Sequence, residues 1–134
     1  MIGTNSWESA AYEKVIRGSV VDNDTLKEAM RTAVKSDLLL VDSARDYGVG
    51  KGPKLIGECC PDEIMISSKY TPFTRFKPGQ VRDSVGKDLK DFGRKSIEVY
   101  WLYMPNDIPE YLKEIIELHK EGKIEYIGVS NLNL

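Results

Sequence analysis

Hydrophobic residues follow two patterns that alternate along the chain. Apolar positions three or four residues apart are typical of amphipathic helices, whereas short apolar runs without alternation are typical of strands buried on both faces of a parallel sheet. The helical pattern predicts helices within residues 25–34, 53–56, 81–92 and 107–119. The apolar runs predict strands at residues 38–42, 63–68, 97–102 and 124–129, and residues 1–4 are expected to form a first short strand.

Polar residues and glycines mark the ends of these helices. Capping-box spacing predicts two helix starts: Thr25 with Glu28, and Asp107 with Glu110. Pro53 suits the first turn of the short second helix, where a backbone N–H is not needed. Gly93 and Gly122 stand where a helix ends in a left-handed residue.

The order of strands and helices predicts an α/β fold with about five parallel strands and four helices outside them. A doubly wound nucleotide-binding fold is one possibility, but its G-x-G-x-x-G fingerprint is missing, since Gly48 and Gly50 are followed by Pro53. The other possibility is a β/α barrel, in which functional side chains gather at the carboxyl ends of the strands. Those ends carry a site-like set of side chains: Asp42, Lys69, Tyr103, Ser130 and Asn131.

Length and charge limit the domain organisation and the partners. The chain has 134 residues, which is one ordinary domain by length and about half of the ~250 residues of a closed eight-unit barrel. If the fold is a barrel, it is therefore a single incomplete barrel domain over residues 1–134, comprising strands one to five. The net charge is -2 and no basic cluster could follow a phosphate backbone, so no nucleic-acid partner is expected. Without a long apolar segment or a signal pattern, we expect no membrane partner and a cytoplasmic location.

The cysteines and the histidine are expected to be structural. Cys59 and Cys60 are adjacent, which fits neither a disulfide framework nor a metal site, so reduced thiols and no metal are expected. His119 is the only histidine and stands near the end of a predicted helix, where we expect it to cap or pack.

Four features of the chain resemble the aldo-keto reductase family and occur in the family's order. They are Asp-Ser-Ala-Arg-Asp-Tyr-Gly-Val-Gly at residues 42–50, a short helix ending in Ile56–Gly57, Ser-Lys-Tyr at residues 68–70, and Gly-Lys-Ile-Glu-Tyr-Ile-Gly-Val-Ser-Asn at residues 122–131. The resemblance implies the first part of a (β/α)8 (TIM-type) barrel. It also implies an enzyme that transfers a hydride from NADPH to a small aldehyde or ketone.

The resemblance implies catalytic roles for Asp42, Tyr47, Lys69 and Tyr103. A hydride that arrives at a carbonyl carbon leaves negative charge on the oxygen, so a proton donor must lie close to it, and Tyr47 is the candidate. A phenol titrates near ~10, and the ammonium group of Lys69 would lower that value. Asp42 would keep Lys69 charged and oriented. Tyr103 stands where the family normally has a histidine, and its phenol is still able to donate a hydrogen bond to the substrate.

The resemblance implies a cofactor-binding set as well: Gly3, Thr4, Asp42, Ser130 and Asn131. Ser130 and Asn131 correspond to the pair that hydrogen-bonds the nicotinamide carboxamide. In the family, loops after the later strands hold the cofactor's phosphates, so we expect the 134-residue chain alone to bind NADPH weakly or not at all.

Two further expectations concern partners and the pocket. The open sheet edges near residues 1–4 and 124–129 predict a homo-oligomer or a missing C-terminal half, and a non-catalytic regulatory or binding subunit remains the alternative function. Trp7 is a candidate for the pocket wall. Trp101 and Tyr103 share one strand face, so Trp101 fits deeper in the barrel only if a small neighbour makes room for it.

Overall fold

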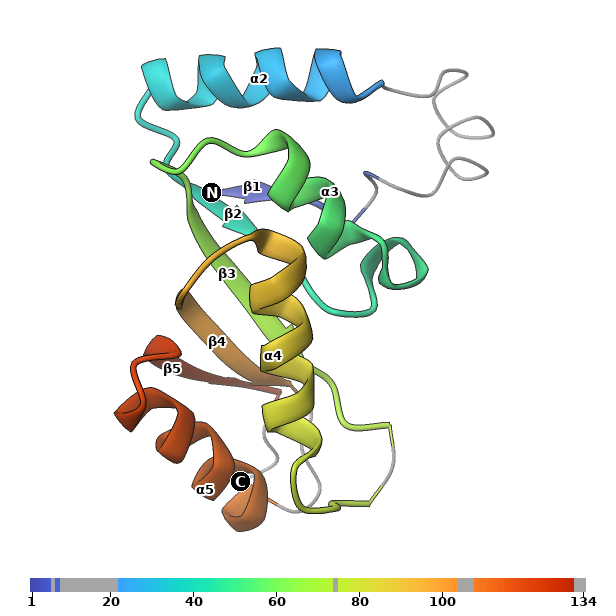
Figure 1. Ribbon diagram of the computed structural model, residues 1–134, viewed down its shortest axis with the longest axis vertical. Helices are drawn as coiled ribbons and strands as arrows, with labels where there is room; N and C mark the ends of the chain where they lie inside the picture. The colour runs from blue at the N-terminus through green and yellow to red at the C-terminus, as the bar shows by residue number, and fades with distance from the viewer. Residues whose placement is uncertain (6, 8–21, 74, 104–107, 132–134) are drawn as a thin grey trace.

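The computed structural model describes residues 1–5, 7, 22–73, 75–103 and 108–131 as a curved sheet with helices along its outer side (Figure 1). The strands are β1 (Ile2–Gly3), β2 (Leu40–Asp42), β3 (Met65–Tyr70), β4 (Ile97–Tyr103) and β5 (Ile124–Ser130). The helices are α2 (Asn23–Lys35), α3 (Gly52–Cys59), α4 (Gln80–Phe92) and α5 (Ile108–Lys120), with a 3-10 helix, η1, at Tyr47–Gly50.

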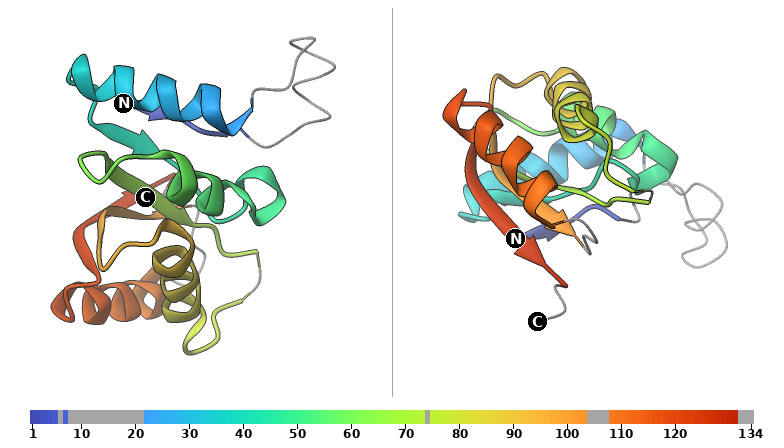
Figure 2. Two further views of the ribbon diagram at one scale, coloured as in Figure 1. Left: turned by 45° about the horizontal axis from the view of Figure 1, so that its top comes forward. Right: turned by 90° about the horizontal axis from the view of Figure 1, so that it is seen from below.

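The sheet has the topology of a partial β/α barrel. Its strands lie in chain order, β1-β2-β3-β4-β5, and every pair is parallel. The two views in Figure 2 show that the helices stay on the outer side of the sheet. The predicted α/β fold with five parallel strands and four helices is therefore confirmed for the part of the chain that the structure describes.

The first predicted capping box is wrong. Helix α2 begins at Asn23, and Asp22 is its N-cap, because Asp22 Oδ1 accepts a hydrogen bond from Thr25 N at 2.8 Å. Thr25 therefore lies in the first turn and donates to the cap. Both residue types favour N-caps, so the sequence alone permits either start. The other predicted pair depends on Asp107, which lies outside the described residues.

Several strand boundaries also differ from prediction: β1 is limited to Ile2–Gly3, and β4 and β5 each end one residue later than predicted, at Tyr103 and Ser130. Strand β2 begins only at Leu40, because Leu38 N donates to Ala33 O at 2.9 Å and so closes the end of α2. Leu38 is 46% exposed, so the first part of the predicted run is not buried on both faces. Strand β3 begins at Met65 instead of residue 63 and extends through Lys69 to Tyr70, beyond the predicted run.

The main hydrophobic core fills the space between the sheet and the helices. The strands and helices contribute fully buried aliphatic side chains, including Val41, Ile66, Leu102, Val85 and Ile115. Gly57 lets α3 approach α4 closely, since a Cβ there would overlap the carbonyl oxygen of Asp91. The close packing of these helices holds the loop between β2 and α3, which carries part of the candidate site.

The opposite face of the sheet is more open. Met65 lies two positions before Ser67 on β3, and Tyr126 lies two positions before Gly128 on β5, so both side chains are on this face. Met65 is 43% exposed and Tyr126 is 68% exposed. This inner face carries the polar side chains at the carboxyl ends of the strands. Among the described helices, none combines the length and the apolar character needed to cross a membrane.

Candidate active site

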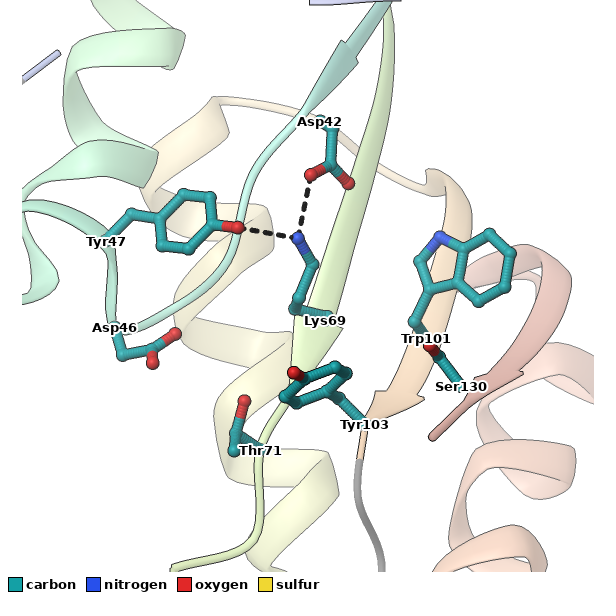
Figure 3. A pocket seen from close by; sticks show the side chains of 8 residues that line it. All are labelled: Asp42, Asp46, Tyr47, Lys69, Thr71, Trp101, Tyr103 and Ser130. Carbon is teal, nitrogen blue, oxygen red and sulfur yellow. Dashed lines mark hydrogen bonds and ion pairs between the residues drawn. The ribbon is translucent and has the colours of Figure 1, made fainter. Parts of the chain in front are cut away.

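The parallel register places Asp42 and Lys69 on adjacent strands at the carboxyl edge of the sheet. Asp42 ends β2 and lies opposite Ser67 of β3, and Lys69 follows two positions later, so its side chain is on the same face as that of Ser67. Tyr47 begins η1, five residues after Asp42, and its hydroxyl points toward Lys69 of β3 (Figure 3). The sequence-predicted catalytic residues Asp42, Tyr47 and Lys69 therefore come together.

Lys69 is the centre of this cluster. Its Nζ donates to Asp42 Oδ2 at 2.7 Å and to Tyr47 OH at 2.9 Å (Figure 3). The ammonium group also lies 4.7 Å from the centre of the Tyr47 ring. The lysine thus contacts both the carboxylate that balances its charge and the phenol predicted to be the proton donor.

The charge state of Lys69 depends on these partners. Burial opposes its positive charge, but the hydrogen bonds to Asp42 and Tyr47 outweigh burial, and the pKa of Lys69 is raised. The side chain is only 15% exposed, so water screens the ammonium little. Lys69 therefore remains positively charged through the neutral range.

Asp42 is held by its backbone and by its side chain. Thr4 Oγ1 and Thr4 N both donate to Asp42 O, at 2.9 and 3.1 Å, while Ser67 Oγ donates to Asp42 Oδ1 at 3.1 Å. Thr4 is buried, and the structure gives it the role of fixing the end of β2. Neither Thr4 nor Gly3 lines the pocket described below.

Tyr103, Ser130 and Asn131 form a second group at the same edge. Tyr103 pairs with Ser130 in the β4–β5 register, and Tyr103 OH accepts a long hydrogen bond of 3.4 Å from Asn131 Nδ2. Ser130 Oγ donates to Asn131 Oδ1 at 2.9 Å. The exposed hydroxyl and amide groups supply both donors and acceptors, which fits a carboxamide as a ligand.

A pocket with a volume of about 380 Å³ joins the two groups (Figure 3). Its lining comprises Asp42, Asp46, Tyr47, Lys69, Thr71, Trp101, Tyr103 and Ser130. Trp101 fits deep in this face because its register partner is Gly128, where a Cβ would overlap the indole ring. The condition that a small neighbour must make room is therefore met. Trp7 packs instead against Leu26, Leu55 and Cys59.

Comparison with known protein families identifies the family of this chain. The model of the aldo/keto reductase family matches residues 1–134. The chain belongs to the aldo/keto reductase family.

Aldo-keto reductases from more than one organism resemble this chain. The aldo-keto reductase YhdN of Bacillus subtilis is 26% identical over 128 residues, covering 84% of this chain and 39% of the relative. The aldo-keto reductase of Klebsiella pneumoniae, solved in complex with NADPH, is 25% identical with a TM-score of 0.78 over 98% of this chain and 45% of that protein. The thermostable aldo-keto reductase Tm1743 is 27% identical with a TM-score of 0.77, over 98% of this chain and 48% of that protein. The chain thus spans less than half the length of these relatives.

The sequence patterns did not predict an ion-pair cluster between the loop after β2 and helix α4. Arg45 Nη1 lies 3.0 Å from Asp88 Oδ1 and 2.6 Å from Asp91 Oδ2, and Ser68 Oγ donates to Asp88 Oδ2 at 3.0 Å. Burial raises the pKa of Asp88 to about 6, although Arg45 and Ser68 favour its carboxylate. The cluster ties the loop before Tyr47 to α4.

Two pocket residues were also missed, Asp46 and Thr71. Both lie in loops, where neither helical nor strand periodicity assigns a direction to a side chain. The available signal was position: Asp46 precedes Tyr47, and Thr71 follows the carboxyl end of β3.

The cysteines and the histidine lie outside the pocket lining. Both thiols are free, Cys59 is buried, and burial raises the pKa of Cys60 to about 12, which leaves it protonated and unreactive at neutral pH. His119 Nδ1 lies 2.9 Å from Ile124 O, so the ring connects the end of α5 to β5. The structural role predicted for His119 is confirmed.

Proposed function

We propose that this chain is part of an NADPH-dependent reductase that converts a small aldehyde or ketone to an alcohol. The observation that carries the proposal is the contact of Lys69 Nζ with both Tyr47 OH and Asp42 Oδ2, at 2.9 and 2.7 Å, at the wall of a pocket. A phenol beside a fixed ammonium group is suited to proton transfer to a developing alkoxide.

Each residue of the cluster has a separate task in this proposal. Tyr47 donates the proton to the carbonyl oxygen, Lys69 stabilises the phenolate that remains, and Asp42 keeps Lys69 charged and oriented. Tyr103 donates a second hydrogen bond to the same oxygen from the other side of the pocket. Bound NADPH would supply the hydride, and the carbonyl carbon would receive it.

The proposed cofactor contacts lie at the end of β5. Ser130 lines the pocket, whereas Asn131 lies outside its lining and accepts a hydrogen bond from Ser130 Oγ. The hydroxyl and the amide match the donors and acceptors of the nicotinamide carboxamide. The relative from Klebsiella pneumoniae was solved with NADPH, which supports this choice of cofactor. Thr4 contributes by holding the backbone of Asp42 in place.

The experiment that tests the proposal follows NADPH consumption with a reactive aromatic aldehyde. It uses the completed barrel, meaning this chain joined to the remaining β/α units of an aldo/keto reductase, because this chain spans less than half of its relatives. Lys69→Met should reduce turnover by a factor on the order of 10² or more, since the phenolate loses its counter-charge. Lys54→Met is the control, because Lys54 is 72% exposed on α3. Equal turnover in the two variants would overturn the proposal.

One observation favours a second candidate, a non-catalytic regulatory or binding subunit. Tyr103 stands at the position where the aldo/keto reductase resemblance leads us to expect a histidine, and a phenol is bulkier than an imidazole. Tyr103→His in the completed barrel separates the candidates. Equal or higher turnover supports the reductase, whereas a barrel that binds NADPH and stays inert both with and without this change supports the regulatory subunit.

A further inference from the structure

Trp101 and Ser67 extend the cluster of Asp42 by two hydrogen bonds. Trp101 Nε1 donates to Ser67 Oγ at 2.9 Å, and Ser67 Oγ donates to Asp42 Oδ1 at 3.1 Å. The other carboxylate oxygen, Oδ2, accepts from Lys69. The chain of contacts therefore runs from β4 through β3 to β2 and back to Lys69.

The chemistry of these groups fixes the direction of the chain. An indole N–H is able only to donate, so Ser67 Oγ must accept from Trp101 and has its single proton free for Asp42. The carboxylate then has a donor on each oxygen, one neutral and one charged. Hydrogen bonds to a charged group are stronger than those between neutral groups, so loss of the Ser67 donor should weaken the hold on the Asp42 carboxylate.

Burial and packing keep the two donors in place. Ser67 is 2% exposed, which leaves water little access to replace its hydroxyl. The indole fills the space left by Gly128 on β5, and Figure 3 shows its nitrogen turned toward the side of Asp42. A phenyl ring at position 101 would fill part of the same space but would carry no donor.

Resting on the proposed function, we propose that Trp101 and Ser67 are positioning residues that hold the Asp42 carboxylate in the orientation that anchors Lys69 beside Tyr47. They act through Asp42 and take no part in proton transfer themselves. Their effect should therefore appear as coupling between Trp101 and Asp42 and as a loss in kcat with little change in KM.

The first measurement needs no activity. In the 134-residue chain, the NMR resonance of the Trp101 indole N–H should move in Asp42→Ala, although the indole hydrogen-bonds only to Ser67. It should move in Ser67→Ala and return toward its original position in Ser67→Thr, which keeps the hydroxyl. Ser43→Ala is the matched control, because Ser43 is a buried neighbour of Asp42 whose Oγ has no hydrogen-bond partner among the described residues. An indole resonance that is the same in Asp42→Ala and Ser43→Ala would overturn the proposal.

The second measurement uses the completed barrel and the aldehyde assay. Trp101→Phe and Ser67→Ala should each lower kcat on the order of tenfold, Ser67→Thr should restore it, and the double variant should be no slower than either single one. Losses that multiply in the double variant, or wild-type kcat in Ser67→Ala, would contradict the proposal. If no variant reduces the aldehyde but the indole resonance still responds to Asp42→Ala, the proposed function fails and the positioning contacts stand.

Discussion

At the scale of single residues, the pairing of Trp101 with Gly128 decides the shape of the pocket. The two residues face each other across β4 and β5, and the indole ring occupies the space that a side chain at position 128 would need. In that position the indole reaches Ser67 and forms part of the pocket wall. A large aromatic residue on the inner face thus depends on one residue of the neighbouring strand.

Gly128→Ala should therefore destabilise the chain by about 1–3 kcal/mol, the usual cost of an extra carbon in a packed site, because the indole must shift. Gly86→Ala on α4 is the matched control: apart from the neighbouring backbone of its own helix, no atom lies within 4 Å of the added Cβ, and alanine should stabilise the helix by about 0.5–1 kcal/mol. Urea unfolding of both variants measures these changes. A Gly128→Ala chain as stable as the wild type would contradict this account of the pocket.

Sequence patterns predicted the residues at the centre of the site better than the residues that hydrogen-bond to them. Asp42 and Lys69 could be predicted because each stands at the carboxyl end of an apolar run, where a parallel sheet collects functional side chains. Ser67 and Trp101 could not, because their contact depends on the register between β3 and β4, which a single sequence does not determine.

At the scale of elements, Arg45 connects the loop before η1 to helix α4. Its guanidinium lies 3.0 Å from Asp88, whose side chain is fully buried and also accepts from Ser68, the neighbour of Lys69. The loop that carries Tyr47 and the strand that carries Lys69 are thus fixed to the same helix. This contact is one reason why the two side chains meet.

Asp88 should make the stability of the chain fall as pH rises from about 4 to about 6. The unfolded side chain releases its proton near 3.8, whereas the folded one keeps it up to a pKa of about 6, so in this range the folded state binds more protons. The difference of about two pKa units corresponds to roughly 3 kcal/mol. Urea unfolding of wild type and Asp88→Asn at several pH values measures it.

The two stability curves should differ in slope in that range, because the free energy of unfolding of the wild type should fall as pH rises and that of Asp88→Asn should not fall in this way. The control is Asp37→Asn, at an exposed position with a φ of 55°, a backbone region that asparagine tolerates well. Its curve should stay parallel to that of the wild type. A parallel curve for Asp88→Asn would show that burial does not control this carboxyl.

The types and order of the elements were predictable, but their ends were not. Apolar spacing predicted α2, α4 and α5 and the strands between them, since each presents one apolar face to a common core. The predicted start of α2 was wrong because Asp22 and Thr25 are both favourable N-cap residues. The hydrogen bond from Thr25 N to Asp22 Oδ1 identifies Asp22 as the N-cap. Helix ends depend on a few local contacts, which periodicity does not reveal.

At the scale of the whole molecule, the described sheet is an arc with β1 and β5 at its edges. The strands are parallel and paired in chain order, and the helices cover only the outer side (Figure 1). Tyr126 on the inner face is 68% exposed, so that face is open to solvent in this chain. The pocket is lined by residues of β2 to β5 and of the loops that follow β2 and β3.

The 134-residue chain should accordingly show no saturable NADPH binding in the micromolar range, whereas the completed barrel should bind. The proposed contacts at Ser130 and Asn131 reach only the nicotinamide end of the cofactor. Quenching of protein fluorescence during an NADPH titration measures both proteins, because Trp101 lines the pocket. Tight binding by the chain alone would contradict the expectation and would indicate that a second copy completes the site.

Tyr47 is the proposed proton donor, and removal of its hydroxyl tests this role. Tyr47→Phe keeps the ring and removes only the hydroxyl that contacts Lys69. In the completed barrel, carbonyl reduction should fall by a factor on the order of 10² or more, while NADPH affinity stays nearly unchanged. Tyr126→Phe, which changes an exposed tyrosine outside the pocket, should keep full turnover. Full turnover in Tyr47→Phe would show that Tyr47 is not the proton donor.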